Sequence, residues 1–260
     1  MFDYTFSYES LEFFLLVFVR ISCFVVTAPF FSMQNIPRRV KAGFSIIFAF
    51  VLYQVLPSHE VPDYNTVLGY SSLILKEAAC GVFIGLGAYI CNTIVQFAGK
   101  IADMDVGLSM VQLMDPLTRD SSGFMGTFYQ YVVVLIMLVT DFHHYLIRAL
   151  VDTFSIIPIG GAVFSSEDFM TTIVQFLNDY MIISFRICLP IVASMLLLNC
   201  ILGILVKTAP QINMFSVGIQ LKILFGLLIL FLTIGVLPSA SEYIFEEMKV
   251  MITAFVKSMT

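Results

Sequence analysis

The stretch that organises this chain is DMDVGLSMVQLMDPLTRDSSGFMG, at residues 103–126. It stands between two long apolar runs without charge, residues 78–99 and 121–140, the second of which it partly overlaps. Its centre, residues 106–114, is again apolar, whereas aspartates border it and the Asp-Pro and Ser-Gly pairs are typical of turns. A plain polar loop does not need such a centre. We therefore expect an irregular segment that stays near or within the membrane part of the protein.

Two interpretations of this segment are open from the residues alone. In the first, irregular backbone lies at membrane depth, which is tolerated only where it is buried in protein or lines a water-filled cavity. In the second, the preceding helix continues for a few residues and a surface loop follows. A surface loop would tolerate deletion with little consequence, so deletion of the segment distinguishes the two interpretations.

The composition of the 260 residues is that of an integral membrane protein. Hydrophobic residues make up 59% of the chain and charged residues only 12%, whereas soluble domains carry about 25% charged residues. The net charge of -5 gives no reason to expect nucleic-acid binding. The five cysteines lie in apolar runs without CxxC spacing, so we predict neither a disulfide framework nor a zinc site.

Hydrophobic patterning predicts an all-α, polytopic membrane protein with a single membrane domain, residues 1–260. A membrane helix needs about 20 apolar residues, and six segments reach or approach that length. Cations at Arg38, Arg39 and Lys41 place the first loop in the cytoplasm by the positive-inside rule. A tail at residues 239–260 is predicted to form an amphipathic helix. The six predicted spans are residues 11–31, 42–56, 78–99, 124–140, 182–206 and 214–237.

Several features argue against six plain helices that face lipid. No proline interrupts residues 73–106, and a helix of that length would reach about 50 Å, beyond a hydrocarbon core of about 30 Å. Arg20 and Arg186 lie inside predicted spans, where a charge facing lipid is costly, so we expect both to be buried against protein or to face water. Gly81 and Gly85 form a GxxxG motif, which lets a second helix pack closely.

The sequence offers no catalytic constellation, and we expect neither an enzyme nor a cofactor. GxSxG, P-loop and HExxH motifs are absent, and no predicted span contains two aspartates. Asp141, His143 and His144 form the one candidate metal cluster. Adjacent histidines on a regular helix point about 100° apart, which is a poor geometry for chelation. We therefore predict no metal site and interpret these residues as the interfacial end of a span.

Four stretches occur in a recognisable order over nearly the whole chain. They are Arg20 with APFF at 28–31 and IPRRVK at 36–41, GLSM at 107–110 through MDP at 114–116, HYLIRALVDTFSIIPIG at 144–160, and APQINMFSVG at 209–218. Each motif is loose by itself, but four in register form a specific pattern. Together they resemble the FliR family of flagellar export-gate proteins.

This resemblance implies a subunit of the flagellar type III protein export gate, in the bacterial inner membrane at the flagellar basal body. It implies helices arranged as tilted hairpins, assembly with FliP and FliQ subunits near FlhB and FlhA, and passage of unfolded flagellar export substrates. It also implies that one segment forms a plug inside the channel. That segment consists of Val106, Gly107, Leu108, Ser109, Met110, Val111, Gln112, Leu113, Met114, Asp115 and Pro116.

Other functions stay open on the residues. The export-gate subunits of virulence injectisomes share the fold, so the flagellar assignment rests on the resemblance. A small secondary transporter would use polar residues near the midplane, and Arg20, Gln96, Arg186 and Asn199 fit that interpretation, although the sequence shows no inverted repeat. An intramembrane enzyme would need a paired catalytic group, which we do not find.

Overall fold

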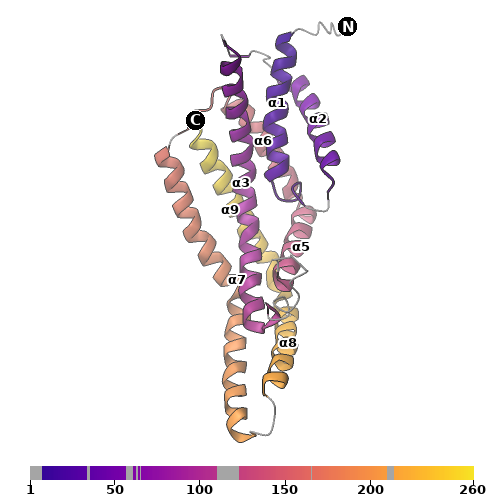
Figure 1. Ribbon diagram of the computed structural model, residues 1–260, viewed down its shortest axis with the longest axis vertical. Helices are drawn as coiled ribbons and strands as arrows, with labels where there is room; N and C mark the ends of the chain where they lie inside the picture. Colours follow the sequence, from indigo (N-terminus) through magenta and orange to yellow (C-terminus); the bar gives the residue numbers. More distant parts are fainter. Residues whose placement is uncertain are drawn as a thin grey trace. The chain divides into compact units, whose positions relative to one another are not determined.

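The computed structural model describes residues 8–33, 36–56, 61–62, 64, 66–109, 123–164, 166–209 and 214–260, without the side chains of 166–168 and 214–216. Across these ranges the chain is helical and has no strand (Figure 1), which confirms the predicted all-α class. The elements are α1 (Tyr8–Thr27), α2 (Arg38–Val55), α3 (Val67–Val106), α5 (Phe124–Val139), α6 (Phe142–Ile156), α7 (Ser166–Thr208), α8 (Met214–Thr233), the 3-10 turn η1 (Ile234–Val236) and α9 (Leu237–Lys257).

The helices pack into two compact units, each built from segments that are distant in the sequence. The first unit comprises Met1–Ile90, Asp141–Phe176 and Glu246–Thr260, and the second comprises Cys91–Thr140 and Leu177–Phe245. Three helices, α3, α7 and α9, therefore contribute residues to both units. The single membrane domain expected from hydrophobicity stays a prediction.

Among the described residues, fewer stretches are long and apolar enough to span a membrane than the six predicted spans. Within the described ranges, four helical stretches are long and apolar enough to cross a membrane, or up to five if the bent pair α5 and α6 counts as one. The span predicted at residues 42–56 is helical in α2. This helix is not among the four, because its 18 residues include Arg38, Arg39 and Lys41. Helix α6 is an element that hydrophobicity did not predict as a separate helix.

Helix α3 is continuous over 40 residues, and no proline occurs in this stretch. At 1.5 Å per residue it is about 60 Å long, twice the thickness of a hydrocarbon core of about 30 Å. In its most apolar part, 56% of the residues are buried inside the protein, against 22% in α7 and 17% in the stretch from α8 to α9. The apolar residues of α3 thus serve mainly as protein core, whereas α7 and α8 leave most of theirs exposed.

Within the first unit, α1 packs beside α2 (Figure 1) and also against the GxxxG face of α3. A Cβ atom added to Gly81 would overlap the backbone oxygen of Arg20, and one added to Gly85 would overlap the hydroxyl of Thr27. The two backbones can approach this closely only because α3 has no side chain at these positions.

The second unit has two further close contacts between helices at glycines. A Cβ atom at Gly99 on α3 would overlap the backbone of Gly126 on α5, and one at Gly226 on α8 would lie 2.7 Å from the side chain of Val106. Helix α8 runs back beside the last part of α7 (Figure 1), as expected for a helical hairpin. Glycines therefore set the close contacts of α3 with α5 and α8.

We predict that Gly81→Ala destabilises the protein and that Gly43→Ala does not. The added methyl group at Gly81 meets the fixed backbone of α1, and overpacking of this kind costs about 1–3 kcal/mol. Gly43 on α2 has nothing within 4 Å of its would-be Cβ, so alanine there should stabilise by up to about 1 kcal/mol through helix propensity. Thermal unfolding in detergent, followed by circular dichroism, measures both. Equal melting temperatures for the two variants would contradict the packing argument.

Candidate functional site

The first unit contains a charged cluster inside an apolar core. Arg20, in the middle of α1, is 0% exposed. Its Nε donates a hydrogen bond to Oε2 of Glu77 on α3 at 2.6 Å. Its Nη1 donates to the carbonyl oxygens of Thr153 at 3.3 Å and Ile157 at 3.1 Å, and the guanidinium carbon lies 4.3 Å from the ring centre of Phe154. The charge of Arg20 therefore faces protein and not lipid.

The backbone contacts of Arg20 fall at the C-terminal end of α6. The Thr153 carbonyl oxygen also accepts from the backbone N–H of Ile157 at 2.8 Å. The last carbonyl groups of a helix carry partial negative charge, so a cation beside them is favoured. Glu77 continues the network beyond the helix end, because its Oε1 accepts a hydrogen bond from the backbone N–H of Gly160 at 2.8 Å. The neighbouring Lys76 donates to the Gly160 carbonyl oxygen at 3.3 Å.

The ion pair thus holds three segments together, α1, α3 and the end of α6 with its following turn. The turn needs a glycine, because Gly160 has a φ of +75° and a Cβ atom there would lie 2.7 Å from Leu73 and 2.8 Å from Pro62. Sequence reasoning required a protein environment for Arg20 but did not identify Glu77, which is 57 residues away. One feature of the sequence could have identified Glu77 as the partner: it carries the opposite charge and directly precedes the predicted span 78–99.

The second unit contains a carboxylate at the start of α5. Asp103 on α3 is 2% exposed, and both of its oxygens accept from the backbone N–H of Met125 at 3.1 Å. Helix α5 has no side-chain hydrogen bond from its own N-cap residue, Gly123, so Asp103 supplies the cap from another helix. An anion at a helix N-terminus is also favoured by the helix dipole. A Cβ atom at Gly123 would overlap the Asp103 carboxylate, so only glycine fits there.

This Asp103 junction stands where the proposed plug segment leaves α3. Val106 is fully buried, and Gly107 ends the helix with a φ of +88°, a conformation that glycine adopts without steric cost. Leu108 and Ser109 are half-buried. The remaining candidate plug residues lie outside the described residues; they are Met110, Val111, Gln112, Leu113, Met114, Asp115 and Pro116.

Arg186 on α7 differs from Arg20, because its side chain is exposed. It lines a cavity of about 260 Å³ in the second unit, together with apolar residues such as Pro190 and the hydroxyl-bearing Tyr129, Thr233 and Tyr243.

Long apolar helices, buried charges that satisfy helix ends and glycine-mediated contacts define a polytopic α-helical membrane protein. The family model of the bacterial export proteins, family 1, matches residues 11–248, so the chain belongs to this family. The flagellar biosynthetic protein FliR of Bacillus subtilis (strain 168) is 35% identical over 229 residues, which cover 86% of each chain. That of Escherichia coli (strain K12) is 28% identical over 233 residues, covering 88% of this chain and 87% of the relative.

A third relative is matched over nearly its whole length. The flagellar biosynthetic protein FliR of Aquifex aeolicus (strain VF5) is 27% identical over 255 residues, which cover 97% of this chain and 96% of the relative. These relatives confirm the resemblance that the four sequence stretches indicated. The family match, residues 11–248, includes α3, α6 and α1 from residue 11 onward, the helices that form the Arg20 cluster.

We predict that removing one partner of the buried ion pair is more damaging than removing both. Arg20→Met or Glu77→Met leaves an uncompensated buried charge and should destabilise the protein by about 3–5 kcal/mol, whereas the double replacement Arg20→Met with Glu77→Met should recover part of this loss. Unfolding in detergent of all three variants gives the coupling free energy.

Arg186→Met serves as the matched control on α7, and it should change the stability of the isolated chain little. Strictly additive effects of the Arg20 and Glu77 replacements would contradict a direct interaction between the two side chains.

Proposed function

We propose that this chain is a subunit of the flagellar type III protein export gate in the bacterial inner membrane. The observation that carries the proposal is similarity over 86–88% of the chain to proteins named flagellar biosynthetic protein FliR, together with membership of the bacterial export family. In this role the chain helps to form the channel through which unfolded flagellar substrates leave the cytoplasm.

Assembly with other chains is supported by the exposed apolar surface of α7. Exposed large hydrophobic residues extend from Met170 to Val206, which corresponds to about 54 Å along the helix axis. Even a straight helix tilted by about 40° would carry this surface across about 41 Å, more than a hydrocarbon core of about 30 Å covers. Part of the surface therefore needs a protein neighbour.

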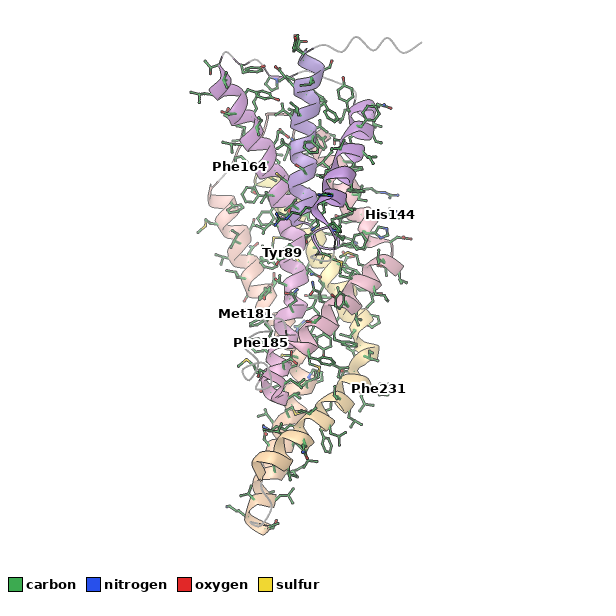
Figure 2. All side chains as sticks on the ribbon, turned by 45° about the vertical axis from the view of Figure 1, so that its right-hand side comes forward. Tyr89, His144, Phe164, Met181, Phe185 and Phe231 are labelled. Carbon is green, nitrogen blue, oxygen red and sulfur yellow. The ribbon has the colours of Figure 1, made fainter. Side chains whose placement is uncertain are left out.

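Large aromatic side chains are exposed on both α7 and α8. Phe185 on α7 is 54% exposed and Phe231 on α8 is 72% exposed, and both rings project from their helices (Figure 2). Aromatic residues are enriched at the centres of protein interfaces. We propose FliP and FliQ as the neighbours of these helices, with FlhB and FlhA close by, as the resemblance implies.

We further propose that residues 106–116 form a plug in the assembled channel. The Asp103 contact with Met125 supports this, because it brings the end of α3 directly to the start of α5. A connection between two points in contact needs only a few residues, yet residues 107–122 lie between them. Their length and apolar character therefore serve something other than connection.

A plug of this composition would close the channel by excluding water. Apolar constrictions block ions by dewetting, and Leu108, Met110, Val111, Leu113 and Met114 would supply the apolar surface. Methionine is flexible and fits irregular surroundings. The glycine at Gly107 and the Asp115-Pro116 turn would let the segment move aside when a substrate passes.

Deletion of residues 108–113 should open an ion leak through the assembled gate, because the constriction loses its apolar lining. Replacement of the same residues by Ser and Gly should also open a leak, because a polar segment of the same length does not exclude water from the constriction. The variant is expressed with its partner subunits, co-purification verifies assembly, and membrane conductance is measured. A correctly assembled deletion complex that stays tight to ions would reject the plug and favour a surface loop.

The Asp103 junction gives a milder test of the same idea. Asp103→Ala removes the cap of α5 and should destabilise that helix start by about 1 kcal/mol. It should also raise the ion leak of the assembled gate without abolishing assembly. Asp105→Ala, two residues along the same helix, is the matched control, and an equal leak in both variants would argue against a specific role for the junction.

The flagellar assignment itself is tested by deleting the gene. We expect non-motile cells without hooks or filaments, restored by the intact gene on a plasmid. Normal flagella in the deletion strain, with loss of virulence secretion, would favour the injectisome alternative. Transport of a defined solute by the purified chain alone would favour a secondary transporter.

A further inference from the structure

Three potential metal ligands meet at the start of α6. Asp141 precedes the helix with a φ of +55°, in the left-handed region. One ligand atom each of Asp141, His143 and His144 lies within 4.8 Å of the other two. The centres of the two imidazole rings are 4.0 Å apart. The divergence of about 100° expected for neighbours on a regular helix therefore does not keep these two side chains apart.

A second observation concerns the side chain of His143. Its Nδ1 atom is buried and has no hydrogen-bond partner among the described residues. The His143 ring is in contact with the ring of His144, and the centre of the Phe30 ring is 6.1 Å from that of His143. A buried imidazole nitrogen without a partner is unfavourable, and coordination of a cation is one way to satisfy it.

We propose that Asp141, His143 and His144 bind a divalent transition metal ion, with zinc as the best match. Two imidazole nitrogens and one carboxylate oxygen, with a fourth position left for water, form a ligand set that zinc adopts in proteins. Ligands about 2.0–2.1 Å from a tetrahedral ion are about 3.3 Å from one another. Nδ1 of His144 and Oδ1 of Asp141 already have this spacing, at 3.4 Å.

The surroundings of the cluster are compatible with a cation. The side chain of His144 is 60% exposed and lies on the outside of its unit (Figure 2), so an ion can reach the site from solvent. The nearby ammonium of Lys249 lies over the rings of Phe142 at 5.8 Å and Tyr145 at 5.5 Å. Glu246 pairs with it at 2.6 Å and offsets its charge. The positive end of the α6 dipole opposes a cation, and the Asp141 carboxylate offsets that field.

A metal ion bound here would rigidify the turn that precedes α6. It would join the left-handed residue Asp141 to two residues of the first helical turn. This role is independent of the export function and of the plug, because it concerns only the start of α6. We therefore test it on the purified chain without reference to export.

The experiment measures zinc binding to the full chain in detergent, without a polyhistidine tag. All variants carry Cys200→Ser, because Cys200 is an exposed thiol that would bind zinc by itself. Equilibrium dialysis with metal analysis should give one zinc ion per chain. Asp141→Asn, His143→Gln and His144→Gln should each weaken binding at least about tenfold, since even the loss of an outer-shell partner weakens metal sites 10–100-fold. Asparagine tolerates the left-handed conformation at residue 141.

One control and one spectrum complete the test. Asp152→Asn should bind zinc like the parent chain, because Asp152 lies on the same helix but does not belong to the cluster. Cobalt added in place of zinc should show visible absorption of a nitrogen and oxygen site without thiolate bands. Absent or weak binding, thiolate bands, or unchanged affinity in the three ligand variants would mean adventitious metal only and would overturn the proposal. Circular dichroism verifies that each variant remains helical.

Discussion

The buried pair of Arg20 and Glu77 is the interaction on which the first unit depends. A charge in the middle of an apolar helix has to find a partner within the protein, and here the partner is on α3. Buried pairs add little stability compared with well-packed apolar residues. The pair instead specifies which helices meet, because any other arrangement would leave a charge alone in an apolar core. It selects α1, α3 and the end of α6 as neighbours.

The same face of α3 provides both the charge and the close packing. Glu77, Gly81 and Gly85 follow each other at intervals of four residues, so they lie along one side of the helix. Glu77 binds Arg20, while the two glycines receive the backbone of α1 from Arg20 onward. Close approach of the helices shortens the distance that the ion pair has to cover. Packing and electrostatics therefore favour the same register of α1 against α3.

The two units apply one electrostatic rule with opposite signs. In the first, the cation of Arg20 satisfies carbonyl groups at the C-terminal end of α6. In the second, the anion of Asp103 satisfies an N–H group at the N-terminal end of α5. Each sign matches the partial charge at that helix end. Short helices in an apolar setting lack water to satisfy their ends, so charged side chains from long helices take this role.

The sequence by itself determined the membrane class, the helical pattern of α3 and of the final helix, and the need to keep Arg20 away from lipid, because these follow from composition and local periodicity. Only the tertiary structure decided that Glu77 is the partner, that Arg186 is exposed, that α6 is a separate helix and that two histidines meet Asp141. These depend on which surfaces pack together across dozens of residues, or on one left-handed residue that interrupts a helix. Neither leaves a periodic signal in the chain.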